Sequence, residues 1–525
     1  MNHTKQSFIN GQWQETDGET FNNHNPVTNK TIEQYSSATV TQGASAVIGT
    51  KASFSAFKKL SGLQRASFLE QIAAEIEALG DDLLNTANAE TGLGLVRLTG
   101  ERGRTCNQIR AFANMLKDGS WVRASIDTAD AQRTPPKPDL RRMLRPIGPV
   151  LVFPASNFPL AFGVLGGDTA SALAAGNPVV IKAHPAHPAT SELCMIAAER
   201  ALEKCGIASN TIAMVQGCTI ELAQSLVINE DIQAIGFTGS LTAGRSIMDL
   251  AATRATPIPV YAEMGSTNPV FITPEAMQAR GSEIATGLAG SMSMGTGQFC
   301  TSPGVIVTLE NSQFQTELTE AVNSANQGYL LHPSIACGLQ SSINSLVNNE
   351  SVKVLAGVTN INLEENSLKV ANSLLTTTAQ NFLTDASLHA EAFGPLSLLV
   401  NCQNEEELLD VAHAIHGNLT ATIHCQEDDK LAAPLAELLS DHVGRLIVNG
   451  YPTGVEVCAS QQHSGPYPAC SSPATTSVGS DAISRFTRFI AYQDMPQALL
   501  PAELRNENNL QLLRLVNNDF QNTAI

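Results

Sequence analysis

The sequence has little charge and few cysteines. Only 15% of its 525 residues are charged, and 31 Lys and Arg against 49 Asp and Glu give a net charge of −18. Because this charge repels polyanions, we expect neither nucleic acid nor an anionic membrane surface as a partner. The ten cysteines include no C-x-x-C pair, which argues against a disulfide scaffold, a zinc ribbon and a redox dithiol.

Long apolar runs are also missing. The most apolar stretch, Val150 to Ala183, is interrupted by prolines, glycines and Asp168, and it falls short of the ~18 uninterrupted apolar residues that span a bilayer. The beginning, MNHTKQSFINGQW, has the pattern of neither an export signal nor a transit peptide. We therefore expect the protein in the cytoplasm.

The length and the apolar patterns predict an α/β protein with more than one domain. Helical patterns at 44–60, 65–79 and 83–88 fill the first hundred residues. From Pro149, apolar strands alternate with helices, as in a parallel, doubly wound sheet. A second series, starting near Pro259 with VYAEM and NPVFI, predicts a second α/β domain. The segment Asp127 to Met143 and the stretch after Tyr451 fit neither series, and we interpret them as excursions or subunit-bridging arms.

Two side chains are candidates for covalent and acid–base chemistry. Cys300 lies in the glycine-flanked turn GTGQFCT, where a thiol can have a lowered pKa and act as a nucleophile. An inert buried cysteine is the alternative. Glu263 ends an apolar strand, where a carboxylate needs a partner or a task, and a paired structural acid stays an equal alternative.

Other candidates follow predicted strands. The turn AIGFTGS leads from a strand into a helix, whose N-terminus favours a phosphate. Its spacing is G-x-x-x-x-G, so an ordinary structural turn is the alternative. Asn157 and Lys182 stand at strand ends, the edge where α/β sheets bind ligands; a helix cap and a solvated lysine are the alternatives.

A metal site is not expected from the paired histidines of HPAHP. His184 and His187 lie across prolines, so no helix places both on one face, and no third ligand is apparent.

Seven motifs in register resemble the aldehyde dehydrogenase superfamily over nearly the whole chain. They are FINGQW, FPASNFPLAF, PVVIKAHPAHP, IGFTGSLTAG, YAEMGSTNPV, GQFCTSPG and EAFGPLSLLV. The finer motifs GERGRT, EMGSTNP, PTGVEVC, SGPYPA and TTSVGSDAI are similar to the branch of 2,5-dioxovalerate (α-ketoglutarate semialdehyde) dehydrogenases. The bacterial NADP-dependent fatty aldehyde dehydrogenases are near relatives of that branch.

The resemblance implies roles for the motif residues. Cys300 matches the nucleophile, Glu263 the general base, and Asn157 the amide that receives the oxyanion together with the backbone N–H of Cys300. We expect burial to raise the pKa of Glu263 toward neutrality. The implied cofactor contacts are Lys182, His184, Pro185, Gly239, Ser240, Gly244, Glu391 and Phe393.

The resemblance also implies an architecture. It consists of a Rossmann-type cofactor domain at 1–126 and 147–257, a catalytic α/β domain at 258–450, a bridging oligomerisation arm at 127–146 and 475–498, and a C-terminal tail at 499–525. Such arms imply a homodimer or a homotetramer.

The expected reaction is the NAD(P)-dependent, metal-free oxidation of a small aldehyde, 2,5-dioxovalerate, to 2-oxoglutarate. A long-chain fatty aldehyde is the alternative substrate; a cysteine-dependent esterase or acyl transferase and an inactive relative are the alternative classes. Arg102, Arg104 and Arg110 are candidates to bind the far carboxylate, unless they only pair with Glu101 and neighbouring acids. Pro185 stands where NAD-preferring members carry a carboxylate, so we expect a modest preference for NADP.

Overall fold

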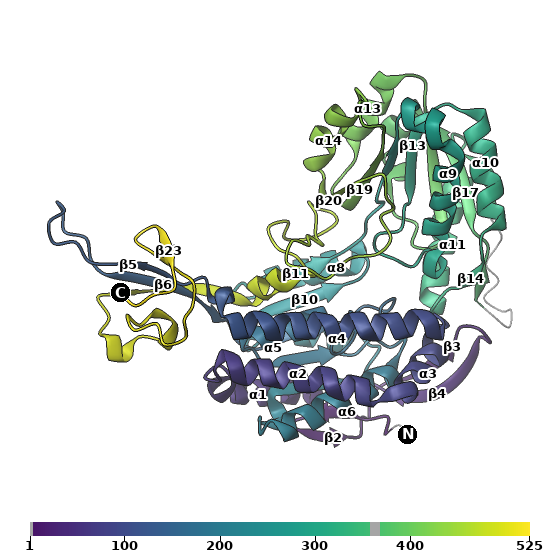
Figure 1. Cartoon of the computed structure of the whole chain (residues 1–525). Coiled ribbons are helices and arrows are strands. Elements are labelled where there is room, and N and C mark those ends of the chain that lie inside the picture. The colour runs from purple at the N-terminus through teal and green to yellow at the C-terminus, as the bar shows by residue number, and fades with distance from the viewer. Residues whose placement is uncertain (1–3, 358–367) are drawn as a thin grey trace.

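Two seven-stranded sheets organise the chain, which a computed structural model describes over residues 4–357 and 368–525 (Figure 1). The first sheet has the order β11 (Val260–Glu263), β10 (Ala234–Thr238), β7 (Val150–Phe153), β8 (Val179–Lys182), β9 (Ile212–Val215), β1 (Ser7–Ile9) and β2 (Gln12–Gln14). The first five strands are parallel to one another, which confirms the predicted sheet. The strand β1 pairs antiparallel with both β9 and β2.

Helices cover both faces of this sheet, because its strands are apolar on both sides. The helices are α1 (Val40–Phe57), α2 (Gly62–Ala78), α3 (Gly80–Thr91), α4 (Leu95–Asp118), α5 (Gly167–Ala175), α6 (Pro188–Lys204), α7 (Ile220–Val227) and α8 (Leu241–Ala252). Val150 and Val152 of β7 join the core under α2, α4, α5 and α6, whereas Leu151 and Phe153 join the core under α1, α7 and α8. The three helices predicted for the first hundred residues are thus present, with shifted ends.

The second sheet has the order β15 (Lys353–Ala356), β17 (Ser373–Thr378), β18 (Leu396–Cys402), β13 (Val305–Leu309), β12 (Val270–Ile272), β19 (Asn418–His424) and β20 (Val443–Val448). All of its pairs are parallel except that of β15 with β17. Its helices are α9 (Pro274–Ser293), α10 (Ser312–Ser324), α11 (Pro333–Val347), α12 (Ala379–Thr384), α13 (Glu405–Ala414) and α14 (Ala432–Ser440). Two small two-stranded sheets are separate from these. One pairs β3 (Thr20–Asn25) with β4 (Lys30–Ser36), and the other pairs β14 (Gly328–Tyr329) with β16 (Lys369–Val370).

The assignment of VYAEM to the second series is wrong. β11 pairs in parallel with β10 of the first sheet, from Ile235 opposite Val260 to Thr238 opposite Glu263. Helix α8 makes the crossover between these two strands. A four-residue apolar strand is compatible with either sheet, and only the pairing decides.

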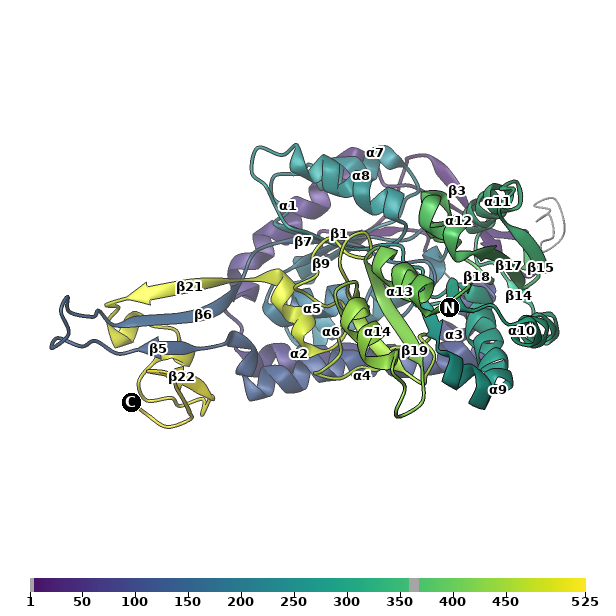
Figure 2. The same ribbon diagram turned by 90° about the horizontal axis from the view of Figure 1, so that it is seen from above.

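A third sheet forms an arm that projects from the body (Figures 1 and 2). Its order is β21 (Thr487–Gln493), β6 (Leu140–Pro146), β5 (Ser125–Asp127), β22 (Arg514–Val516) and β23 (Asp519–Gln521). Residues 499–525, expected as a separate tail, thus add two strands to the arm. Across the described residues, no helix combines the length and the apolar character needed to cross a bilayer.

The candidate residues lie where the two large sheets meet. Asn157 follows β7, and Lys182 and Glu263 end β8 and β11, at the carboxyl edge of the first sheet. Cys300 and Glu391 precede β13 and β18, at the amino edge of the second sheet. The fold therefore places two distant parts of the chain at one cleft.

Candidate active site

Three reactive side chains meet at this junction. Single ligand atoms of Glu263, Cys300 and His463 lie within 4.8 Å of one another. His463 Nε2 is 3.0 Å from Oε1 of Glu263 and 3.5 Å from Sγ of Cys300. The side chains of Glu263 and His463 are 4% and 1% exposed, so their charges interact with little screening.

The segment after Tyr451 holds this group together. Ser477 donates its hydroxyl to Oε2 of Glu263 at 2.5 Å, and its backbone N–H donates to the carbonyl of His463 at 3.0 Å. The backbone N–H of His463 donates to Oγ1 of Thr476 at 2.9 Å. The interpretation of this segment as an excursion or arm is therefore wrong around residues 463 and 477, which line the site.

Burial and charge set the protonation of the group. Burial raises the pKa of Cys300 well above its ordinary value, and the Glu263 carboxylate raises it further. Burial alone would also raise the pKa of Glu263, but the charge of His463 and the hydrogen bond from Ser477 lower it. The expectation of a raised pKa for Glu263 is thus wrong, since His463 was not foreseen. The resting group has a thiol and an ionised carboxylate.

The turn before Cys300 has an unusual backbone. Gly295, Thr296 and Gly297 have φ values of 56°, 60° and 64°, in the left-handed region that glycine tolerates best. A Cβ on Gly297 would lie 2.2 Å from the carbonyl carbon of Gly394. Close packing against this neighbouring loop therefore requires glycine.

Asn157 lies against the same turn. Its Nδ2 donates to the carbonyl of Gln298 at 3.0 Å, and its side chain is buried. On the other side, Nδ2 of Asn268 donates to the carbonyl of Cys300 at 2.8 Å. Two buried amides thus fix the backbone that carries the thiol.

One face of α4 supports the loops of the site. Positions 97, 101, 104 and 108 lie within about 60° of one another on a helix that turns about 100° per residue. Arg97 donates to the carbonyl of Asn157 at 2.7 Å, and Glu101 accepts the N–H groups of residues 160 and 161 at 2.8 and 3.0 Å. Gln108 accepts the N–H of Gly479 at 2.9 Å. The helix therefore positions both the Asn157 loop and the end of the Ser477 segment.

Of the three predicted arginines, the structure brings only Arg104 to the site. Its guanidinium lies over the ring of Phe162 at 5.4 Å and interacts electrostatically with Cys300 and Glu263. Arg102 donates to the carbonyl of Gly80 at 3.0 Å, and Arg110 makes a two-bond ion pair with Glu77. They point elsewhere because they lie about 160° and 120° from Arg104 around the helix.

The predicted cofactor contacts of the first sheet share its carboxyl edge. Lys182 is 9% exposed and forms no ion pair within residues 4–357 and 368–525. Burial lowers its pKa to about 8 and that of His184 well below its ordinary value. His184 is thus neutral, its Nδ1 accepts the N–H of Ala186 at 3.1 Å, and Pro185 lies between these residues.

The turn from β10 into α8 leaves its backbone open to a ligand. Ser240 caps α8 by accepting the N–H of Ala243, and Gly239 is exposed before it. A Cβ on Gly244 would meet Met264 at 2.6 Å, so this helix packs tightly on β11. An exposed glycine at a helix N-terminus suits a phosphate.

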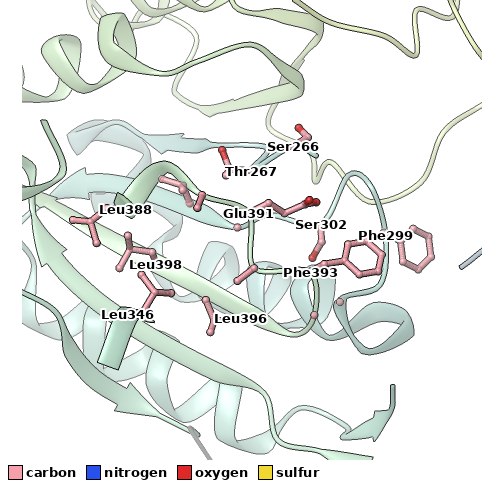
Figure 3. Close-up of a pocket in the computed structure, with 16 residues that line it drawn as sticks. Ser266, Thr267, Phe299, Ser302, Leu346, Leu388, Glu391, Phe393, Leu396 and Leu398 are labelled. Atoms are coloured by element: carbon pink, nitrogen blue, oxygen red, sulfur yellow. The ribbon is translucent and has the colours of Figure 1, made fainter. Parts of the chain in front are cut away.

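Across the cleft, Glu391 and Phe393 line a pocket with Phe299, Ser302, Ser266 and Thr267 (Figure 3). Burial raises the pKa of Glu391 to about 7. A Cβ on Gly265 would lie 2.7 Å from Oε2 of Glu391, so the carboxylate lies directly against the loop that follows Glu263.

Known proteins resemble this chain over most of its length. Residues 13–466 match the Aldehyde dehydrogenase family. Alpha-ketoglutaric semialdehyde dehydrogenase 2 of Azospirillum brasilense is 46% identical over 470 residues, 88% of each chain. Alpha-ketoglutaric semialdehyde dehydrogenase of Acinetobacter baylyi is 42% identical over 524 residues, 98% of each chain.

Solved structures share the fold. The structure of PnpE from Pseudomonas sp. WBC-3 has a TM-score of 0.79 at 22% identity and covers 94% of this chain and 97% of its own. The gamma-glutamyl-gamma-aminobutyraldehyde dehydrogenase of Burkholderia cenocepacia has a TM-score of 0.81 at 19% identity, with coverages of 94% and 97%. On the family match and the two semialdehyde dehydrogenases at 46% and 42% identity, the chain belongs to the aldehyde dehydrogenase family.

Proposed function

We propose that the protein oxidises 2,5-dioxovalerate to 2-oxoglutarate with NADP or NAD, and that Cys300, Glu263 and Asn157 carry the chemistry. The observation that carries this proposal is the contact of Cys300 with a buried carboxylate and imidazole beside the cation Arg104. Two relatives more than 40% identical bear the name of this activity.

In the first step, the uncharged form of His463 takes the proton of the Cys300 thiol. A thiol whose pKa is raised needs a base, and Nε2 of His463 lies 3.5 Å from Sγ. The thiolate then adds to the aldehyde carbon.

Two donors face the alkoxide that results. One is the backbone N–H of Cys300, and the other is the Asn157 amide, which uses one N–H on Gln298 and keeps a second. Donors of this kind contribute about 2.7–4 kcal/mol each to the transition state.

The residues of the cleft fit a nicotinamide dinucleotide. Lys182 is a buried cation, Gly239 and Ser240 open a helix N-terminus, and Glu391 and Phe393 lie across the cleft. Held by these residues, a nicotinamide ring would supply the acceptor for the hydride that leaves the carbon bonded to Cys300. Glu263 then deprotonates the water that hydrolyses the thioester on Cys300.

Arg104 is the proposed partner of the substrate's far carboxylate. The substitution Arg104→Met is expected to raise KM for 2,5-dioxovalerate about 10–100-fold, since a hydrogen bond to a charged group contributes about 1.5–3 kcal/mol. KM for decanal should change little. Arg110→Met is the matched control, because Arg110 is occupied by Glu77. Equal effects on both aldehydes would contradict this role.

Both cofactors are expected to work, with NADP modestly favoured. Position 185 is a proline and offers no carboxylate against the 2′-phosphate, while Lys182 supplies a positive charge. The preference should shrink as ionic strength rises, because salt weakens the attraction between the 2′-phosphate and the lysine. Measuring kcat/KM for both cofactors at low and high salt checks this, and a strong NAD preference in every buffer would contradict it.

The NADP preference should also fall as pH rises through about 8. Burial lowers the pKa of Lys182 to that value, so the ammonium loses its charge in this range, whereas His184 is already neutral. The ratio of the two kcat/KM values against pH measures this. In Lys182→Arg, which stays charged, the ratio should be flat; a parallel decline in both proteins would assign the effect to another group.

The assembly and location proposed are a homodimer or homotetramer in the cytoplasm. The strand β21 is an open edge of the projecting arm, where a second copy can add a strand (Figure 2). Arg104 and the relatives favour the keto acid over a long-chain aldehyde, and the cofactor contacts favour a dehydrogenase over a cysteine esterase.

A further inference from the structure

The cluster of Glu263, Cys300 and His463 has the dimensions of a metal site. Within the described part of the chain, it is the one group of three or more His, Cys, Asp or Glu with ligand atoms this close. Tetrahedral zinc holds its S, N and O ligands at about 2.0–2.3 Å, which sets the ligand atoms about 3.4–3.6 Å apart. In the structure, the N···S and N···O distances are 3.5 and 3.0 Å, and all three ligand atoms lie within 4.8 Å of one another. Small side-chain shifts would suffice.

The ligands are already oriented by their neighbours. Ser477 occupies Oε2 of Glu263, while Oε1 is buried and accepts no well-directed hydrogen bond within the described residues. The backbone of His463 is held by Thr476 and Ser477. Partners that orient metal ligands commonly raise affinity. Oε1 therefore has an unused acceptor position facing the imidazole and the thiol.

The chemistry of the donors selects the ion. A thiolate, an imidazole and a carboxylate leave a fourth position open, as in reactive zinc sites, and the sulfur disfavours Mg²⁺ and Ca²⁺. The ionised set carries two negative charges, which balance a divalent cation. Arg104, whose charge acts on Cys300 and Glu263, opposes the ion, so we expect weaker binding than at closed structural zinc sites.

We propose that Glu263, Cys300 and His463 bind one Zn²⁺ ion, or a similar thiophilic divalent cation, and that the bound ion blocks the reaction. The sulfur forms a bond to the metal, the S–H bond breaks, and the proton leaves to solvent; nothing is oxidised. Inhibition rests on the function proposed above, since it requires Cys300 to be the nucleophile, whereas binding depends on the three ligands alone.

Cobalt substitution tests binding without any turnover. The purified full-length protein, kept reduced with a reagent that contains no thiol, is titrated with Co²⁺. We expect one equivalent to give the visible bands of tetrahedral Co²⁺ and a thiolate-to-cobalt charge-transfer band, and Zn²⁺ to bleach both. The Zn²⁺ concentration that bleaches them should inhibit aldehyde oxidation, and EDTA should restore the rate.

Three variants identify the ligands. Cys300→Ala should remove the charge-transfer band, and His463→Asn should weaken Zn²⁺ binding at least about tenfold. Cys458→Ser removes an exposed thiol of the same segment and should leave both unchanged. A band that persists in Cys300→Ala, or an affinity unchanged in His463→Asn, would overturn the site. Cobalt bands in a protein that oxidises no aldehyde would support the metal site and refute the proposed function. Full aldehyde oxidation at saturating Zn²⁺, with no cobalt bands, would support the proposed function and refute the metal site.

Discussion

Cys300→Ala is expected to lower the rate of aldehyde oxidation by at least about four orders of magnitude while leaving cofactor binding intact. The variant loses the nucleophile, so no covalent intermediate can form. The proposed cofactor contacts at Lys182, Gly239 and Glu391 come from other strands and loops and are untouched. Steady-state rates check the loss of oxidation, and a fluorescence titration with the cofactor checks that binding is retained.

Cys470→Ala is the matched control for this loss. Cys470 is buried, and its backbone pairs with that of Glu263, so its removal disturbs packing near the site without removing the reactive thiol. Its rate should stay within about tenfold of the natural protein's, because a small cavity costs stability more than chemistry. Turnover of Cys300→Ala within a few-fold of the natural protein would end the assignment.

Glu263→Gln should spare the formation of the thioester and block its hydrolysis, because an amide cannot take a proton from water. The expected record is a burst of one reduced cofactor per active site, and then a steady rate at least about 100-fold below that of the natural protein. Rapid mixing with excess aldehyde measures both phases. A normal steady rate with no burst would contradict the role.

His463→Asn separates the two steps further. If His463 activates the thiol, this variant should slow the burst itself, whereas Glu263→Gln should slow only the later steady phase. Both side chains are buried in the same cluster, so a general packing defect would affect both phases in both variants. The contrast between the phases therefore reports the separate roles.

The sequence motifs pointed to two of the three side chains that meet at the site. Glu263 and Cys300 are 37 residues apart in the chain, yet Glu263 ends β11 and Cys300 lies in the turn before β13, and the structure brings their ligand atoms within 4.8 Å. The alternation of strands and helices predicted the parallel sheets, because strands buried on both faces are apolar throughout. Helical periodicity alone separates Arg104 from Arg102 and Arg110, so this distinction was already present in the sequence.

His463 could not be found in the same way. It lies in a stretch of Gln, Ser, Gly and Pro without periodicity, and its position depends on hydrogen bonds to Thr476 and Ser477. Its charge reverses the shift expected for the pKa of Glu263. Similarly, the pairing of β11 depends on the packing of α8, which a short apolar strand does not encode.

The most direct test compares kcat/KM of the purified protein for 2,5-dioxovalerate and decanal, each with NADP and with NAD, by the absorbance of the reduced nicotinamide. The account predicts cofactor-dependent reduction with both cofactors and at least about tenfold higher efficiency for 2,5-dioxovalerate, because only that substrate offers a carboxylate to Arg104. Equal or better efficiency with decanal, or no reduced cofactor with any aldehyde, would contradict it.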